Sequence, residues 1–181
     1  MLPAKVRPAA TPPREGRPIL SVQAASVALA PAAIGARVVA FIVDAIVLLL
    51  IQLLLGSIVG DLTVVGSIAR AVIYAAIGFV YFGYSWTAWR ASPGQRILGL
   101  VTVNADDGST LNWNQATVRW AWLFGPSVLS SLLQFGALAP IGGIVVFGYG
   151  IYLLYTAATD PRKQGFHDKQ AGTIVAVKAA A

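Results

Sequence analysis

The sequence predicts an all-α membrane protein of four transmembrane helices with a small cytoplasmic β-sheet, and three observations support this fold class. Hydrophobic residues make up 57% of the 181 residues and charged residues only 11%, far from the average of soluble domains. Four apolar stretches are long enough to cross a bilayer. The basic residues gather at one end of these stretches. The predicted spans are residues 38–59, 67–89, 120–138 and 141–158.

The first span follows an arginine and contains an aspartate. Its polar residues are Asp44, Gln52 and Ser57, and the α-helical rise gives residues 38–59 a length of about 33 Å. Arg37 and Asp44 are two helical turns apart and therefore share a face. Because an ionised carboxylate is costly in hydrocarbon, we expect Asp44 to face protein, water or a partner.

Two domains of unequal character are expected. Residues 1–31 contain six of the ten prolines, so they are predicted to form a disordered, Pro/Ala-rich cytoplasmic tail. The stretch 19–30 is too polar for the core of a cleaved signal peptide, and a short helix on the membrane surface is the alternative. Residues 32–181 are expected to form one membrane domain.

The segments outside the bilayer are expected to include a sheet. Residues 96–103 are rich in β-branched positions and residues 110–115 alternate in polarity, and the two stretches flank Asp106-Asp107-Gly108, which is a hairpin signal. Residues 173–178 form another β-branched run. We therefore predict a β-hairpin that residues 173–178 extend to a three-stranded sheet.

The distribution of positive charge predicts the topology. Four spans place both termini on the same side of the membrane. Twelve of the thirteen lysines and arginines then fall on that side, and only Arg70 lies opposite, near the outer end of the second span. By the positive-inside rule, both termini are cytoplasmic.

Three motifs occur in a fixed order. The first is Arg37, Ala40 and Asp44 in the pattern Arg-x-x-Ala-x-x-x-Asp; the second is Ser92-Pro93-Gly94-Gln95 continuing to Gly99 and Val103; the third is His167, Asp168, Ala171, Gly172 and Thr173. Together they resemble the RDD family of bacterial membrane proteins, named for one arginine and two aspartates, over roughly residues 33–178. Gln95 stands where the family usually has lysine, so this position carries no cation unless Arg96 substitutes for it.

The resemblance implies a multi-pass protein of the bacterial plasma (inner) membrane. Some members of the family have been connected with sodium–proton exchange, and most are uncharacterised. Fold-level analogy of this kind does not carry a mechanism to the present chain.

Four charged or titratable residues are expected to converge at the cytoplasmic surface: Arg37, Asp44, His167 and Asp168. In one interpretation they form a proton or cation site, in which Asp44 is the acceptor and Arg37 and His167 tune it. In the other they form a structural clasp, in which Arg37 pairs with Asp168 and ties the terminal segment to the first span. Removing one partner of such a buried pair costs about 3–5 kcal/mol.

Two functions from different classes remain open. One is a membrane-embedded accessory or interaction protein that contacts the lipid bilayer and either a second copy or another membrane protein. The other is a small cation/proton exchanger or solute transporter that works through Asp44 as an oligomer. We expect no enzyme, because neither a Ser-His-Asp arrangement nor a phosphate loop is present. The absence of cysteine and the single histidine argue against a Cys/His metal site, and we expect no cofactor and no nucleic-acid partner.

Overall fold

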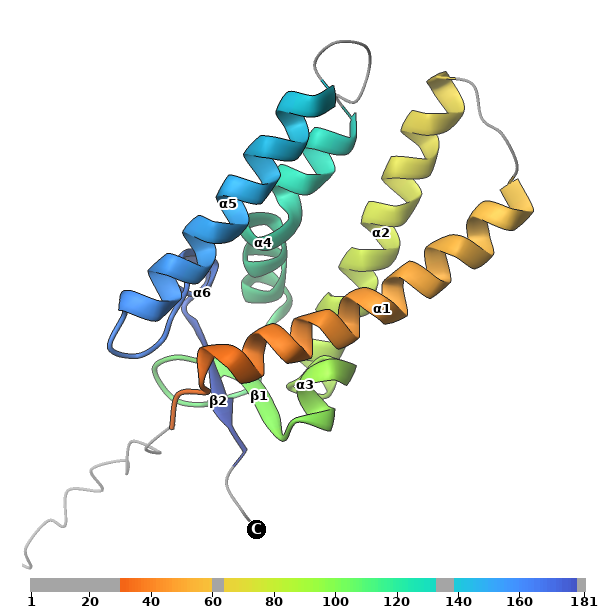
Figure 1. The fold of residues 1–181 in the computed structure, drawn as a ribbon. Coiled ribbons are helices and arrows are strands. Elements are labelled where there is room, and N and C mark those ends of the chain that lie inside the picture. Colours follow the sequence, from red (N-terminus) through yellow and green to blue (C-terminus); the bar gives the residue numbers. More distant parts are fainter. Residues whose placement is uncertain (1–29, 60–63, 133–138, 179–181) are drawn as a thin grey trace, which may run out of the picture.

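The computed structural model describes residues 30–59, 64–132 and 139–178, which contain six helices and one two-stranded sheet (Figure 1). The helices are α1 (Ile34–Val59), α2 (Val64–Ala88), α3 (Pro93–Ile97), α4 (Trp113–Leu132), α5 (Ala139–Thr159) and α6 (Phe166–Ala171). The strands are β1 (Leu100–Asn104) and β2 (Thr173–Val177). The tail predicted for residues 1–31 lies outside the described residues, apart from its last two positions.

Three of these helices are long and apolar enough to cross a membrane: Ile34–Gly56 in α1, Gly66–Ala88 in α2 and Pro140–Thr159 in α5. They correspond to three of the four predicted spans. The span predicted at 120–138 is not confirmed. Helix α4 begins earlier, at Trp113, and its polar first turns and internal Pro126 lower its apolarity, while residues 133–138 lie outside the described residues.

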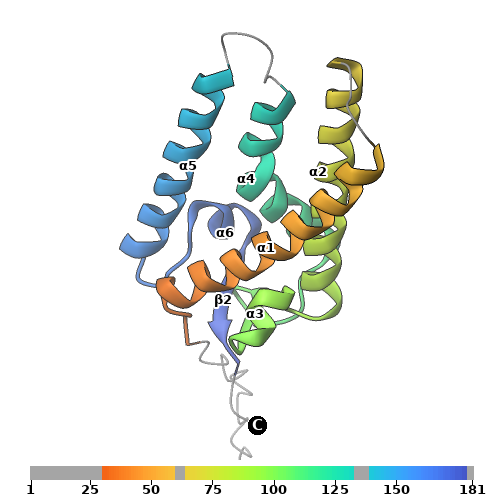
Figure 2. The same ribbon diagram turned by 45° about the vertical axis from the view of Figure 1, so that its right-hand side comes forward.

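The long helices form a bundle that is closed at one end by the short elements. Figures 1 and 2 show α5, α4 and α2 side by side, with α1 crossing them obliquely near α3 and the sheet. Helix α2 packs against α4, α4 packs against α5 and α6, and α1 packs against α3. An aromatic cluster lies between α2 and α4, where the rings of Phe82 and Phe124 stack with centroids 4.8 Å apart.

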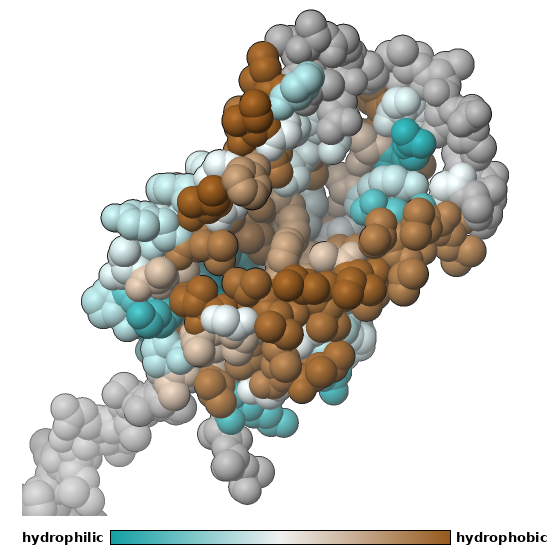
Figure 3. Space-filling view, viewed as in Figure 1, coloured by the Kyte–Doolittle hydropathy of each residue, from teal (hydrophilic) through white to brown (hydrophobic). Residues whose placement is uncertain are grey.

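The outer faces of α1 and α5 are apolar. Leu50 on α1 is 61% exposed, and Ile144 and Phe147 on α5 are 72% and 73% exposed. Figure 3 shows a continuous hydrophobic surface along α1. Contiguous apolar surface of this kind is unfavourable in water but matches lipid chains. The protein is therefore a membrane protein, as its composition indicates.

The sheet differs from the prediction in one strand. Strands β1 and β2 are antiparallel, with Val103 opposite Ile174, so residues 173–178 do pair as expected. The strand predicted at 110–115 is wrong. Asn112 and Gln115 there exchange hydrogen bonds between side chain and backbone N–H at 3.2 and 2.9 Å, and this reciprocal cap starts α4 instead.

The opposite edge of β2 is covered by the residues that lead into α1. The N–H of Ala32 donates to the Val175 carbonyl at 3.0 Å, and the N–H of Val177 donates to the Ala30 carbonyl at 2.9 Å. Residues 96–97 of the predicted first strand belong to α3. The sheet thus lies beside the entrance of α1, which places the terminal motif next to the first one.

Candidate functional site

The three motifs meet in two polar clusters at the sheet end of the bundle. We call the first the ionic cluster: Arg37, Arg119, His167, Asp168 and Thr173. We call the second the Asp44 cluster: Asp44, Tyr81, Ser92 and Gly94. Sequence analysis predicts that Arg37, Asp44, His167 and Asp168 converge. Arg37, His167 and Asp168 do lie together. The prediction is wrong for Asp44, which hydrogen-bonds within the second cluster because α3 docks beside it.

Asp168 is the centre of the ionic cluster. It lies in the first turn of α6, and its side chain is fully buried. One carboxylate oxygen, Oδ2, pairs with Arg37 and also accepts the Gly165 N–H at 2.9 Å. The other oxygen, Oδ1, pairs with Arg119. A single carboxylate therefore joins α1, α4 and α6.

Arg119 is the member of the ionic cluster that the sequence does not single out. Its side chain is buried, donates to the Thr173 hydroxyl at 2.7 Å, and lies over the Trp86 ring at 4.9 Å from the ring centre. The aromatic face offsets part of the cost of burying a guanidinium. In the sequence, Arg119 resembles an ordinary interfacial arginine at the start of a span, and no feature distinguishes it from Arg90 or Arg162.

His167 is neutral at neutral pH. Burial lowers its pKa to about 3; the negative charge of Asp168 opposes this shift, and the positive charges of Arg119 and Arg37 add to it. Its Nε2 lies 3.5 Å from Asp168 Oδ2, and its Nδ1 is buried without a hydrogen-bond partner in the described part of the chain. An imidazole in this state supplies no positive charge to a cation or proton site.

Asp168 itself remains ionised. Burial alone would raise its pKa, but the guanidinium groups of Arg119 and Arg37 outweigh burial and hold the pKa well below its usual range. The cluster therefore contains two arginines around one carboxylate, with a neutral histidine beside them. Arg37 also donates to the Lys163 carbonyl, which helps to stabilise its buried positive charge.

Asp44 faces protein, as the cost of a carboxylate in lipid requires. Its Oδ1 accepts the Tyr81 hydroxyl and the Gly94 N–H, both at 2.8 Å, and its Oδ2 accepts the Ser92 hydroxyl at 2.5 Å. The donors come from α2 and from the start of α3. Three hydrogen bonds satisfy this buried carboxylate within the fold.

The first motif fits the second through close contact as well as hydrogen bonding. A Cβ atom on Gly94 would lie 2.1 Å from the Ala40 carbonyl oxygen and 3.0 Å from Asp44 Cγ. Only glycine allows α3 to approach α1 this closely. Ala40 and Asp44 are one helical turn apart on α1, and both contact Gly94 of α3. Ala40 does so through its backbone carbonyl and Asp44 through its carboxylate.

Gln95 acts as a cap and not as a replacement for a cation. Its Oε1 accepts the Ser92 N–H at 2.9 Å and the Thr102 hydroxyl at 3.0 Å, which a lysine ammonium could not do. Arg96 does not substitute for the family lysine in the site, because its guanidinium lies over the Trp89 ring at 5.3 Å. The remaining motif glycines, Gly99 and Gly172, have φ values of +66° and +62°, a conformation that favours glycine.

A cleft of about 710 Å³ lies among α1, α2 and α4. Neither Asp44 nor any residue of the ionic cluster lines it. Within the described residues, no group of three or more His, Cys, Asp or Glu side chains is placed to hold a metal ion.

Comparison with known proteins finds one family match, and the matched range contains the first two motifs and the third as far as Gly172. The family model described as the RDD family matches residues 31–172. No curated protein and no solved structure matches the chain.

Proposed function

Because this chain belongs to the RDD family, we propose that it is a multi-pass protein of the bacterial plasma membrane that acts as an accessory or interaction protein. In this proposal, α4 is the fourth span, both termini lie in the cytoplasm, and the chain is not an enzyme. The motif residues build the fold, and the function lies in the surfaces that the fold presents to other membrane components.

The observation that carries the proposal is the saturation of the motif charges. Asp168 is held by two arginines and a backbone N–H, and Asp44 is held by three donors. An exchanger that works through Asp44 would have to remove these donors in each cycle. It would also need a path to Asp44, and the cleft among the long helices is lined by other residues.

The proposed orientation follows from the charges at the two ends of the bundle. The sheet end carries Arg37, Arg90, Arg96, Arg119 and Arg162, whereas Arg70 stands near the opposite end of α2. This asymmetry supports a cytoplasmic sheet. With α4 as a span, α5 returns to the same side, and the terminal segment can reach Arg37.

Helix α5 offers a surface for a partner helix. Gly143 and Gly150 are seven residues apart, on nearly the same face, and a Cβ at either position would meet open space. Small residues at such spacing allow two helix backbones to approach closely in a membrane. Exposed Phe147 lies between them along the helix and supplies contact area.

Two experiments test the proposal. Proteoliposomes containing the wild-type protein should show no sodium, potassium or proton flux above empty vesicles, and Asp44→Asn should behave like the wild type. Flux that disappears in a folded Asp44→Asn variant would support the exchanger instead.

The partner surface is tested by photo-crosslinking in cells. A photoreactive amino acid at Phe147 should yield one discrete adduct with a second copy or another membrane protein. The same probe at Leu50, on the exposed face of α1, serves as the matched control. Identical adduct patterns from the two positions would contradict a specific partner surface on α5.

A further inference from the structure

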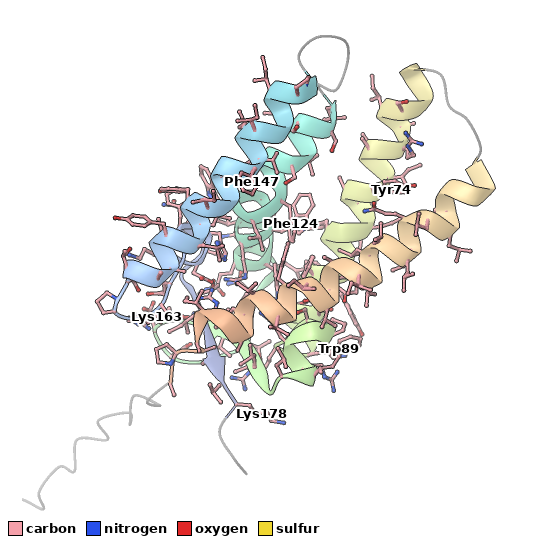
Figure 4. All side chains as sticks on the ribbon, in the orientation of Figure 1. Tyr74, Trp89, Phe124, Phe147, Lys163 and Lys178 are labelled. Atoms are coloured by element: carbon pink, nitrogen blue, oxygen red, sulfur yellow. The ribbon has the colours of Figure 1, made fainter. Side chains whose placement is uncertain are left out.

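The cleft among α1, α2 and α4, which we call the distal cleft, has two chemically different parts. Its residues near the sheet are apolar and aromatic, whereas polar side chains gather farther along the three helices. The polar lining residues are Gln52, Ser67, Arg70, Tyr74, Ser127 and Ser131, and the apolar part includes Phe41, Leu48, Phe82, Trp120 and Phe124. Figure 4 places Tyr74 and Phe124 on the facing helices α2 and α4.

Arg70 is a charge without a counter-ion in this cleft. It belongs to the apolar stretch Gly66–Ala88, and in the described part of the chain it makes neither an ion pair nor a hydrogen bond. None of the residues that line the cleft is acidic. Arg70 is exposed in the second turn of α2, near the end of the span, where a long arginine side chain reaches the headgroup level of the bilayer. Anions at that level are therefore available to pair with this guanidinium.

The neighbouring groups suit the same anion. The side chains of Gln52 and Ser67 carry hydrogen-bond donors that are not used within the described residues, and both line the cleft with Arg70. A planar guanidinium together with an amide and a hydroxyl is the donor set expected for phosphate oxygens. A carboxylate would fit the charge, but a phosphate offers more acceptor oxygens to a set of three donor groups.

The apolar part identifies the source of the phosphate. The cleft opens beside Phe41 and Leu49, which are 46% and 52% exposed on the hydrophobic face of α1. Figure 3 shows the hollow among α1, α2 and α4 adjoining this hydrophobic surface. A ligand with a phosphate at Arg70 and an alkyl chain along Phe41 and Leu48 would match both parts of the cleft.

We propose that the distal cleft is a binding site for a phospholipid, whose headgroup phosphate pairs with Arg70 and whose acyl chain packs on the apolar part. The volume of about 710 Å³ lies within the range of ligand sites and accommodates a portion of such a molecule. The lipid comes from the leaflet opposite the sheet. This inference is independent of the partner surface on α5.

The test uses the full-length protein in mild detergent with a phosphatidylglycerol analogue that carries a photoreactive diazirine on its acyl chain. After illumination, mass spectrometry locates the adducts. The expected result is that adducts concentrate on lining residues such as Phe41, Leu48 and Phe124. Unlabelled phosphatidylglycerol should compete, and inorganic phosphate at the same concentration should not.

Variants at Arg70 decide the role of the charge. Arg70→Gln should reduce the adducts in the cleft roughly tenfold or more, the effect of losing a charge-assisted hydrogen bond, and Arg70→Lys should retain part of them. Arg96→Gln is the matched control, because Arg96 lies on the exposed surface of α3 beside Trp89. It should leave the adducts unchanged.

Three outcomes would overturn the proposal. Adducts spread evenly over α1 and α5 would indicate nonspecific contact with lipid. Unchanged labelling in Arg70→Gln would remove the role of the guanidinium. Competition by inorganic phosphate as strong as that by the lipid would make the ligand a free anion. Because Arg70 makes no contact that the fold depends on, Arg70→Gln should fold, which an unchanged melting curve would verify.

Discussion

Replacing Asp168 by asparagine tests the ionic cluster most directly. The substitution keeps the size of the side chain but removes the charge that holds Arg37 and Arg119. Arg119 is buried beneath a tryptophan ring and cannot reach water without disrupting the α4–α6 contact. Leaving a buried charge unpaired costs about 3–5 kcal/mol. We therefore expect Asp168→Asn to lower stability by this amount.

The expected loss of stability differs between substitutions of the two arginines and substitution of Asp168. Arg37→Gln leaves Asp168 paired with Arg119 and bonded to the Gly165 N–H, so the expected loss is that of charged hydrogen bonds, about 1.5–3 kcal/mol. Arg119→Gln likewise leaves Arg37 but also removes the contact with Trp86. The double variant Arg119→Gln with Asp168→Asn should lose less than the sum of the two, because the substitutions share one interaction.

The assay is unfolding by sodium dodecyl sulfate in mixed micelles, followed by tryptophan fluorescence, with membrane accumulation as a second readout. An unfolding curve of Asp168→Asn in sodium dodecyl sulfate equal to that of the wild type would refute the reasoning. Exchanging Arg37 and Asp168 with each other should not restore stability, although a simple two-residue pair would predict partial recovery. The exchange would place an arginine at position 168 against Arg119.

Three further predictions concern packing, pH and topology. Gly94→Ala should destabilise the protein by about 1–3 kcal/mol in the same assay, since its Cβ would collide with the Ala40 carbonyl, whereas Gly143→Ala in open space should not. Stability should fall as pH drops from about 6.5 towards 3, because His167 binds a proton in the unfolded chain and remains neutral when it is buried in the folded protein. The unfolding midpoint measured against pH should show this slope, and His167→Gln should flatten it. Single cysteines at Ser109 and Thr63 should react with impermeant thiol reagents from opposite sides of the membrane, and labelling of both from outside the cell would contradict the proposed topology.

Contacts between distant parts of the chain were predictable where leaving a charged side chain in lipid or without a partner would cost much free energy. The cost of a carboxylate in lipid required Asp44 to face protein, and the cost of an unpaired arginine favoured a partner for Arg37. Both expectations agree with the structure. Three of the spans followed from length and apolarity alone.

Features that depend on competing local interactions were not predictable. Residues 110–115 alternate in polarity like a strand, but the reciprocal cap between Asn112 and Gln115 favours helix. Asp44 and Asp168 sit in different clusters because α3 inserts beside Asp44, and no spacing in the sequence states where a five-residue helix docks. Arg119 was missed for the same reason, since its burial depends on α6 packing against α4.

The location of the clusters separates the contacts that hold the fold together from the distal cleft. Helices in lipid gain little from the hydrophobic effect between them, so polar contacts and close approach determine their arrangement. Here these contacts gather at the sheet end, where Asp168 and Gly94 fix α1 against α6 and α3. Farther along, the Tyr74 hydroxyl reaches the Gln52 carbonyl at 3.1 Å across the distal cleft. Substitutions in the distal cleft, including those at Arg70, can therefore change its lining without disturbing the contacts of Asp168, Asp44 and Gly94 that hold the helices together.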